Sequence, residues 1–357
     1  MRSRNWWLRL VAPPALVVAA ISSIALATGA SAGGSPALPP KPADQLLTML
    51  RNAQQVSVHG TVVEQAGLGL PDLPASIGGD TTTGLLGLTS GKHTMRVWEG
   101  GHARFRVQIL DQLDETELVS NGHAFWTYTY STDKADELRL PDSTSESIAV
   151  APTPGQAAAN FLAVIGKSTN VTTLTTARVA GRDAYTLDIE PLTSATTIGR
   201  ISIDVDAVTG VPLRVRVYAA AANSAAFSIG FTSISFGSID ASLFDFTPPP
   251  NAKVSVATPS SDAASSQLGN GIYLAGSGWA TIVVVPHMTR ETLVGRDSLT
   301  GMFDKMGQRV DGGTLLPTTL VNALLTPDGR LLVGAVPASA LQAAASAAAA
   351  AAVAPTR

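Results

Sequence analysis

The feature that most constrains the fold is an alternation of apolar and polar residues in steps of two. It is clearest in residues 104–109, where every second side chain is apolar, and it recurs in residues 185–189, 201–205 and 211–217. Successive side chains of a β-strand point to opposite faces, so this pattern predicts strands with one apolar face and one polar face. Because the alternation dominates residues 56–254, we expect an antiparallel sheet that buries one face and leaves the other in water.

The residues between these runs predict how the strands connect and bend. Asp206–Gly210 separates two alternating runs and predicts a hairpin turn in which Gly210 adopts a positive φ. The parity of the apolar residues changes between Phe231 and Ile234, which predicts a β-bulge. A bulge bends its strand, so we expect the sheet to be strongly curved.

Two helices are expected to accompany the sheet. Leucines on one face of residues 43–55 predict the first helix. Residues 153–166 begin with a Thr-Pro start signal and end at Gly166, which predicts a second helix that contains Phe161. Each helix would have an apolar side able to cover the apolar face of the sheet.

Residues 66–91 form a glycine-rich excursion with many leucines and only two charged residues. An apolar segment of this kind is not expected to stay bare in water. One interpretation is a long hairpin folded onto its own sheet. The other is a movable flap over a pocket, because glycine permits hinging and leucine favours an apolar floor.

The chain begins with a pattern that is typical of an export signal. Arg2, Arg4 and Arg9 precede an apolar run, and Ala30-Ser31-Ala32 supplies a small-residue cleavage site. We expect cleavage after Ala32 and export to the periplasmic or cell-envelope space. An uncleaved anchor is the alternative, although two prolines shorten its apolar run.

The composition and the breaks in the pattern predict two folded units and their linkers. Hydrophobic residues make up 45% of the chain and charged residues 14%, which is typical of a globular protein. In the second unit we expect a strand at 279–285, a helix at 290–306, and a hairpin of 319–325 with 330–336. The alanine-rich end is interpreted either as a helix docked through Leu341 or as a fraying tail. The predicted divisions are a signal peptide (1–32), a linker (33–42), the main β domain (43–254), a linker (255–270), a small C-terminal α/β domain (271–340) and the alanine-rich tail (341–357).

The sequence contains no local motif for catalysis. Its five histidines show no metal-ligand spacing and it has no cysteine, so neither a metal nor a cofactor is predicted. Asp114, Glu115 and Glu117 are interpreted as a solvated strand edge rather than an acid–base pair. Basic residues are scattered, which argues against a nucleic-acid partner. We expect a protein that is not an enzyme, with a hydrolase of dispersed catalytic residues as the remaining alternative.

Apolar residues near the excursion and the aromatic runs are the candidates for an apolar ligand site. Aromatic rings in residues 125–130 point to both faces of their strand, so one set is expected in the core and the other in a pocket wall or an outer cover. The residues predicted to line the site are Leu70, Leu73, Leu85, Leu86, Trp98, Phe105, Val107, Ile109, Trp126 and Phe161.

Four segments together resemble a known family. The patterns in Met95–Arg106, Ser120–Tyr128, Arg200–Leu213 and Asp240–Pro249 are similar, in order and spacing, to the LolA-like superfamily of lipoprotein and lipid carriers. The resemblance covers about residues 43–254.

This resemblance implies an α+β fold in which an unclosed half-barrel, lidded by helices, holds acyl chains on its concave side. It also implies that an arginine on an early strand bonds the lid, and Arg96 is the matching position. Members related to MucB and RseB add a small C-terminal domain, which residues 278–341 resemble, and regulate an envelope-stress anti-sigma factor. The resemblance therefore favours a carrier of lipid or lipoprotein acyl chains, with a regulator that binds a membrane-anchored protein as the alternative.

Overall fold

The computed structural model describes residues 38–53, 56–70, 88–101, 103–110, 114–139, 168–220, 222–257, 273–286 and 303–353. Over these ranges the chain is mostly sheet, with few helices. The predicted signal peptide, the second predicted helix with Phe161, and the candidates Leu73, Leu85 and Leu86 lie outside the described residues.

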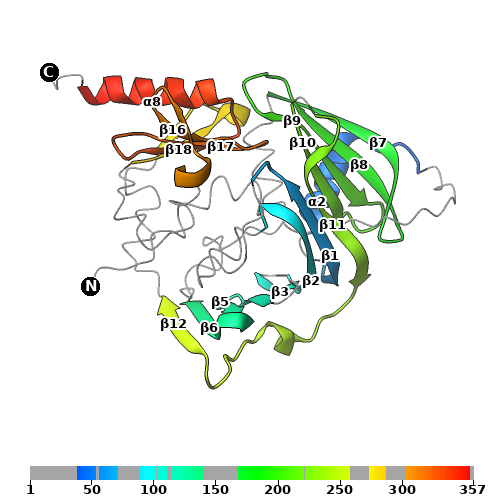
Figure 1. The fold of residues 1–357 in the computed structure, drawn as a ribbon. Coiled ribbons are helices and arrows are strands. Elements are labelled where there is room, and N and C mark those ends of the chain that lie inside the picture. The colour runs from blue at the N-terminus through cyan, green and yellow to red at the C-terminus, as the bar shows by residue number, and fades with distance from the viewer. Residues whose placement is uncertain are drawn as a thin grey trace.

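The main body is one large sheet. Its strands are β1 (Val58–Gly67), β2 (Ser90–Glu99), β3 (Arg104–Leu110), β4 (Glu115–Asn121), β5 (Ala124–Thr129), β6 (Lys134–Arg139), β7 (Thr169–Val179), β8 (Arg182–Pro191), β9 (Ile198–Asp206), β10 (Pro212–Ala219), β11 (Ala225–Phe236) and β12 (Lys253–Ala257). They lie in the order β12-β6-β5-β4-β3-β2-β1-β11-β10-β9-β8-β7. The described strands curve strongly without closing into a barrel, so β12 and β7 form the two edges (Figure 1).

The prediction of an antiparallel sheet is confirmed for every described pair except one. β12 pairs with β6 in the parallel sense. A parallel neighbour needs a crossover connection, and here β12 follows a long excursion from β11 that includes the 3-10 helix η6 (Ala241–Phe244). Local alternation does not reveal that excursion, so the direction of β12 was not predicted.

The predicted bend and hairpin are both confirmed. The register between β1 and β11 shifts because Thr61 pairs with Ser233 and Val62 with Phe231, which leaves Thr232 as the extra residue of a bulge. β9 and β10 form the expected hairpin, and Gly210 has a φ of 76°.

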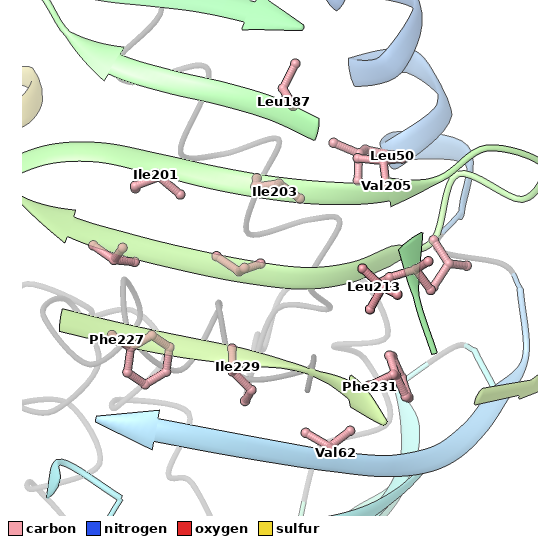
Figure 2. Packing of buried hydrophobic residues seen from close by; sticks show 14 of the residues in the cluster. Leu50, Val62, Leu187, Ile201, Ile203, Val205, Leu213, Phe227, Ile229 and Phe231 are labelled. Carbon is pink, nitrogen blue, oxygen red and sulfur yellow. The ribbon is translucent and has the colours of Figure 1, made fainter. Parts of the chain in front are cut away.

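Helix α2 (Ala43–Asn52) packs on one face of the sheet, which we call the inner face. The helix ends at Asn52, three residues before the predicted limit of 55, and Ala53 is its C-terminal cap residue. Its Leu46 and Leu50 are buried among the inner side chains of β8 to β11. Figure 2 shows Leu50 beside Val205, with side chains of neighbouring strands projecting to the same side.

The opposite face, which we call the outer face, carries η6 and the residues around it. Arg106 of β3 donates a hydrogen bond to the backbone oxygen of Leu243 at 3.0 Å. The ring of Phe246 lies against Trp126 and Tyr128 of β5. The connection from β11 to β12 therefore covers the outer face of β3 to β5.

A second, smaller sheet contains β13 (Tyr273–Ala275), β14 (Ile282–Val285), β15 (Gln308–Val310), β16 (Gly313–Leu316), β17 (Asn322–Leu325) and β18 (Leu331–Gly334). Its order is β13-β14-β18-β17-β16-β15. The predicted hairpin is confirmed as β17 and β18.

The structure corrects one expectation for this unit and decides between the two interpretations of its alanine-rich end. The strand expected from Trp279 begins at Ile282, because Trp279 lies in the 3-10 helix η7 (Gly278–Ala280). The alanine-rich end forms α8 (Ala338–Val353), whose Leu341 is fully buried. The interpretation as a docked helix is therefore correct for the part of α8 from Leu341 to Ala345, whose two end residues are both buried in the core of the second sheet.

The two sheets are joined by specific contacts. The backbone N–H of Thr197 donates to the oxygen of Ala335 at 3.0 Å, and that of Thr319 donates to the oxygen of Leu68 at 2.9 Å. The Trp279 ring packs within the main core. Within the part of the chain that the structure describes, no helix is both long enough and apolar enough to cross a membrane.

Candidate functional site

The inner face is closely filled at the β8 to β11 end. Leu187, Leu213 and Ile229 on three different strands are all 0% exposed, as is Leu46 of α2. Their strands present the apolar residues at alternate positions, so adjacent strands build one continuous apolar layer (Figure 2). This end of the inner face is a packed core.

The inner face at the β3 to β5 end combines the buried Thr116, Ser120 and Thr127 with large apolar side chains, most of which are less buried than those at the other end. Val107 pairs with Leu118 across β3 and β4, and Phe105 lies on the same face. These three side chains and Phe125 of β5 are all only half-buried. The rings of Phe105 and Phe125 have their centroids 6.0 Å apart, within the range of favourable aromatic contacts. Together Phe105, Val107, Leu118 and Phe125 form what we call the half-buried cluster.

Two carboxyl side chains interrupt the apolar inner face. The pairing of β1 with β2 places Glu64 opposite His93 and Glu99 opposite Val58. Burial raises the pKa of Glu64 to about 8 and the pKa of Glu99 to about 7. Both groups are thus held wholly or partly in the neutral form near neutral pH.

The outer face of β5 carries a compact aromatic group. The Trp126 and Phe246 rings are 5.4 Å apart, and the Tyr128 and Tyr130 rings are 4.6 Å apart. The Tyr128 hydroxyl donates to Asp133 at 2.8 Å. Burial, with this hydrogen bond, raises the pKa of Tyr128 to about 12. The predicted division of these rings between the two faces is confirmed: Phe125 faces inward, and Trp126 and Tyr128 face outward.

The interpretation of the acidic cluster on β4 as a solvated edge is wrong. β4 lies between β3 and β5, and Glu117 is only 1% exposed. Arg106 donates to Glu117 at 2.6 Å and Gln108 donates to it at 3.1 Å. The carboxylate is a buried ion-pair partner on the outer face, which a single alternating run does not reveal because both partners look like solvated residues.

A second ion-pair group on the outer face was not predicted. Asp204 of β9 is 0% exposed and accepts hydrogen bonds from Arg214 at 2.6 Å and Thr186 at 2.6 Å. Nearby, Asp206 pairs with Arg182. Burial alone would raise the pKa of Asp206, but hydrogen bonds from Arg182 and Thr209 bring it below its usual range. These pairs give the β8 to β10 end an ordered outer face as well as a packed inner one.

The structure divides the predicted ligand residues between different places. Phe105, Val107 and Ile109 lie on the inner face of β3. Leu70 is half-buried and packs with the apolar residues of the second sheet.

Three of the predicted residues belong to the outer face. Arg96 pairs with Gln108, and Trp98 pairs with Arg106, so both have the opposite parity to Val107. Trp126 contacts Phe246. In β2 and β3 the odd-numbered residues face inward and the even-numbered residues face outward. Applying this alternation to β2 would have assigned Arg96 and Trp98 to the outer face. Glu64 and Leu118 are inner-face residues that the sequence reasoning missed.

The described residues include no group of three or more His, Asp or Glu side chains arranged to hold a metal ion.

Several solved structures resemble this chain, at low similarity. The MucA/MucB complex of Pseudomonas aeruginosa matches with 14% identity and a TM-score of 0.42, over 84% of this chain and 96% of that one. An uncharacterised conserved protein from Thermus thermophilus matches with 12% identity and a TM-score of 0.36, over 61% and 100%. A LolA superfamily protein from Nitrosomonas europaea matches with 12% identity and a TM-score of 0.24, over 58% and 99%. No family model and no curated protein matches the sequence.

Proposed function

We propose that this chain is an exported cell-envelope protein that binds acyl chains of a lipid or lipoprotein against the inner face of a LolA-like half-barrel, and that it is not an enzyme. The ligand would lie on the half-buried cluster and along the neighbouring inner residue Ile109. Binding would need little polar recognition, because apolar burial contributes about 25 cal/mol per Å².

One observation carries this proposal. Apolar side chains occur on the inner face at both ends of the sheet, yet Phe105, Val107, Leu118 and Phe125 are half-buried while Leu187, Leu213 and Ile229 are fully buried. Large apolar side chains that stay partly accessible on a concave surface are typical of ligand sites. Apolar side chains of the inner face therefore form a packed core at one end of the sheet and remain partly exposed at the other.

The experiment is a titration of the full-length mature protein with a dansyl-labelled fatty acid, followed by fluorescence. Val107→Lys places a charge in the half-buried cluster and should weaken binding at least about tenfold. Arg96→Ala changes an exposed residue of the outer face of the neighbouring strand and should leave the affinity within about twofold. Equal effects of the two variants, or failure of the unmodified protein to bind either this probe or an uncharged acyl lipid, would reject the proposal.

The lid role that the resemblance implies for Arg96 is tested by the same titration. Arg96 shares the outer face with Gln108 and Thr61, and α2 packs on the inner face. A loss of affinity in Arg96→Ala would favour the implied lid contact over the ligand path proposed here.

A second candidate function, a regulator that grips a membrane-anchored protein, is favoured by the edge of the smaller sheet. β13 is an edge strand with Tyr273 41% exposed and Leu274 60% exposed, and an open edge strand is a site where a partner chain can add a strand. Photo-crosslinking from position 274 in intact cells tests this. Capture of one membrane protein, lost in Leu274→Lys but kept in Val107→Lys, would favour the regulator.

A further inference from the structure

Glu64 is a buried acidic residue in the middle of the apolar inner face. It lies on β1 between Ile229 of β11 and His93 of β2. Its side chain is 1% exposed, and neither of its carboxyl oxygens has a hydrogen-bond partner among the residues that the structure describes.

An unpartnered carboxyl in such a position works against folding. Burying a polar group without a hydrogen bond costs free energy, and a buried charge costs much more. Burial is the cause that raises the pKa of Glu64 to about 8, so the group is neutral at pH 7 and carries one O–H donor and one free carbonyl acceptor. A leucine would fill the same place at lower cost, so the carboxyl calls for another explanation.

The titratable groups that face Glu64 are few. His93 is directly opposite on β2, and its Nε2 lies 2.8 Å from the backbone oxygen of Ser90, so one ring nitrogen is already engaged. On β11 the facing residue is the apolar Ile229. Glu99 shares the face but lies six positions further along β2, about 20 Å away at the usual rise of a strand.

We propose that Glu64 anchors the polar end of the bound lipid, as a neutral carboxyl that donates a hydrogen bond to a hydroxyl or ester oxygen of an acylglycerol. This rests on the proposed function, and it adds the chemical class of the ligand. An uncharged polar group satisfies both the donor and the acceptor of Glu64. A fatty acid anion would instead bring a negative charge toward a carboxyl that has no counter-ion beside it.

The test compares monooleoylglycerol with the dansyl-labelled fatty acid on the full-length mature protein and on two variants. Glu64→Gln keeps a donor and an acceptor, whereas Glu64→Leu removes both. Monooleoylglycerol should bind the Leu variant about tenfold more weakly than the unmodified protein, the worth of one hydrogen bond. The Gln variant should stay within about threefold.

The pH dependence gives an independent readout. Ionisation of Glu64 removes its donor, so the affinity of the unmodified protein for monooleoylglycerol should fall as the pH rises through about 8. The affinity of the Gln variant should not fall. Gln65→Leu, an exposed outer-face position next to Glu64, is the control and should behave as the unmodified protein.

Each outcome bears on a different claim. Equal monooleoylglycerol affinity in the Leu variant and the unmodified protein would overturn the anchor while leaving acyl binding in place, provided that the dansyl probe still binds. Failure of both probes to bind the unmodified protein would overturn the proposed function and the anchor together. Loss of folding is monitored by thermal melting, and both Glu64 variants are expected to melt no lower than the unmodified protein.

Discussion

The two ends of the main sheet use similar residues on the inner face but bury them to different degrees. At the β8 to β11 end, α2 lies over the apolar layer and the side chains are fully buried. At the β3 to β5 end, η6 lies on the opposite, outer face, and the inner side chains of the half-buried cluster stay partly exposed. The comparison teaches that the alternating pattern defines which residues face inward, while the covering segments decide how deeply those residues are buried.

The largest expected effect comes from removing a leucine at each end. Leu187→Ala deletes a fully buried side chain and should lower the free energy of unfolding by about 2–5 kcal/mol. Leu118→Ala removes the same atoms from the half-buried cluster and should cost about 1 kcal/mol, since less surface is transferred to water. Urea denaturation measures both, and equal losses would mean that the two ends are equally packed.

An outer-face ion pair gives the next effect. Arg106→Ala leaves Glu117 buried without its cation and should destabilise the protein by about 3 kcal/mol. Arg139→Ala removes the partner of Glu137 at an exposed site and should cost less than about 1 kcal/mol. A small effect of Arg106→Ala in chemical denaturation would show that β3 and β4 do not depend on this pair.

The pH dependence of stability separates Glu64 from the packed residues around it. The folded protein holds the proton of Glu64 up to about pH 8, whereas the usual pKa is 4.5, so more protons are bound in the folded state between these values. Stability should therefore fall as the pH rises from about 4.5 to 8, by about 4 kcal/mol. Glu64→Gln should reduce this fall, and unchanged melting curves across that range would contradict the burial of the carboxyl.

The smallest expected difference in stability is between alanine substitutions at two glycines with the same backbone conformation. Gly210 and Gly181 have φ of 76° and 77°. A Cβ at Gly210 would lie 2.7 Å from the backbone oxygen of Met49 in α2, whereas one at Gly181 would have nothing within 4 Å. Gly181→Ala should cost about 1 kcal/mol from backbone strain alone. Gly210→Ala should cost about 1 kcal/mol more in calorimetry, and equal costs would argue against close docking of α2.

Much of the main sheet could be predicted from the sequence, because its determinants are local. The alternation in β8 to β11, the turn ending at Gly210 and the parity change near Phe231 all act over a few residues. The parallel pairing of β12 could not be predicted, since it depends on where the long connection after β11 crosses the sheet.

The candidate site was only partly predictable, for a related reason. Phe105, Val107 and Ile109 were found by parity, but Trp98 and Trp126 were included as members of the aromatic runs, and they face outward. Glu64 was missed because an acidic residue in an alternating run looks solvated until its neighbours Ile229 and His93 are known. Which half of the inner face stays accessible depends on covering segments that alternation does not describe.

The most direct test of the account is to map where a bound acyl chain lies. The full-length mature protein would be irradiated with a diazirine-bearing fatty acid, digested, and the labelled peptides identified by mass spectrometry. The account predicts labels in residues 104–129, on inner-face positions such as Val107 and Leu118, that disappear when unlabelled lipid is added in excess. Competable labels confined to residues 184–231, or the absence of any competable label, would contradict it.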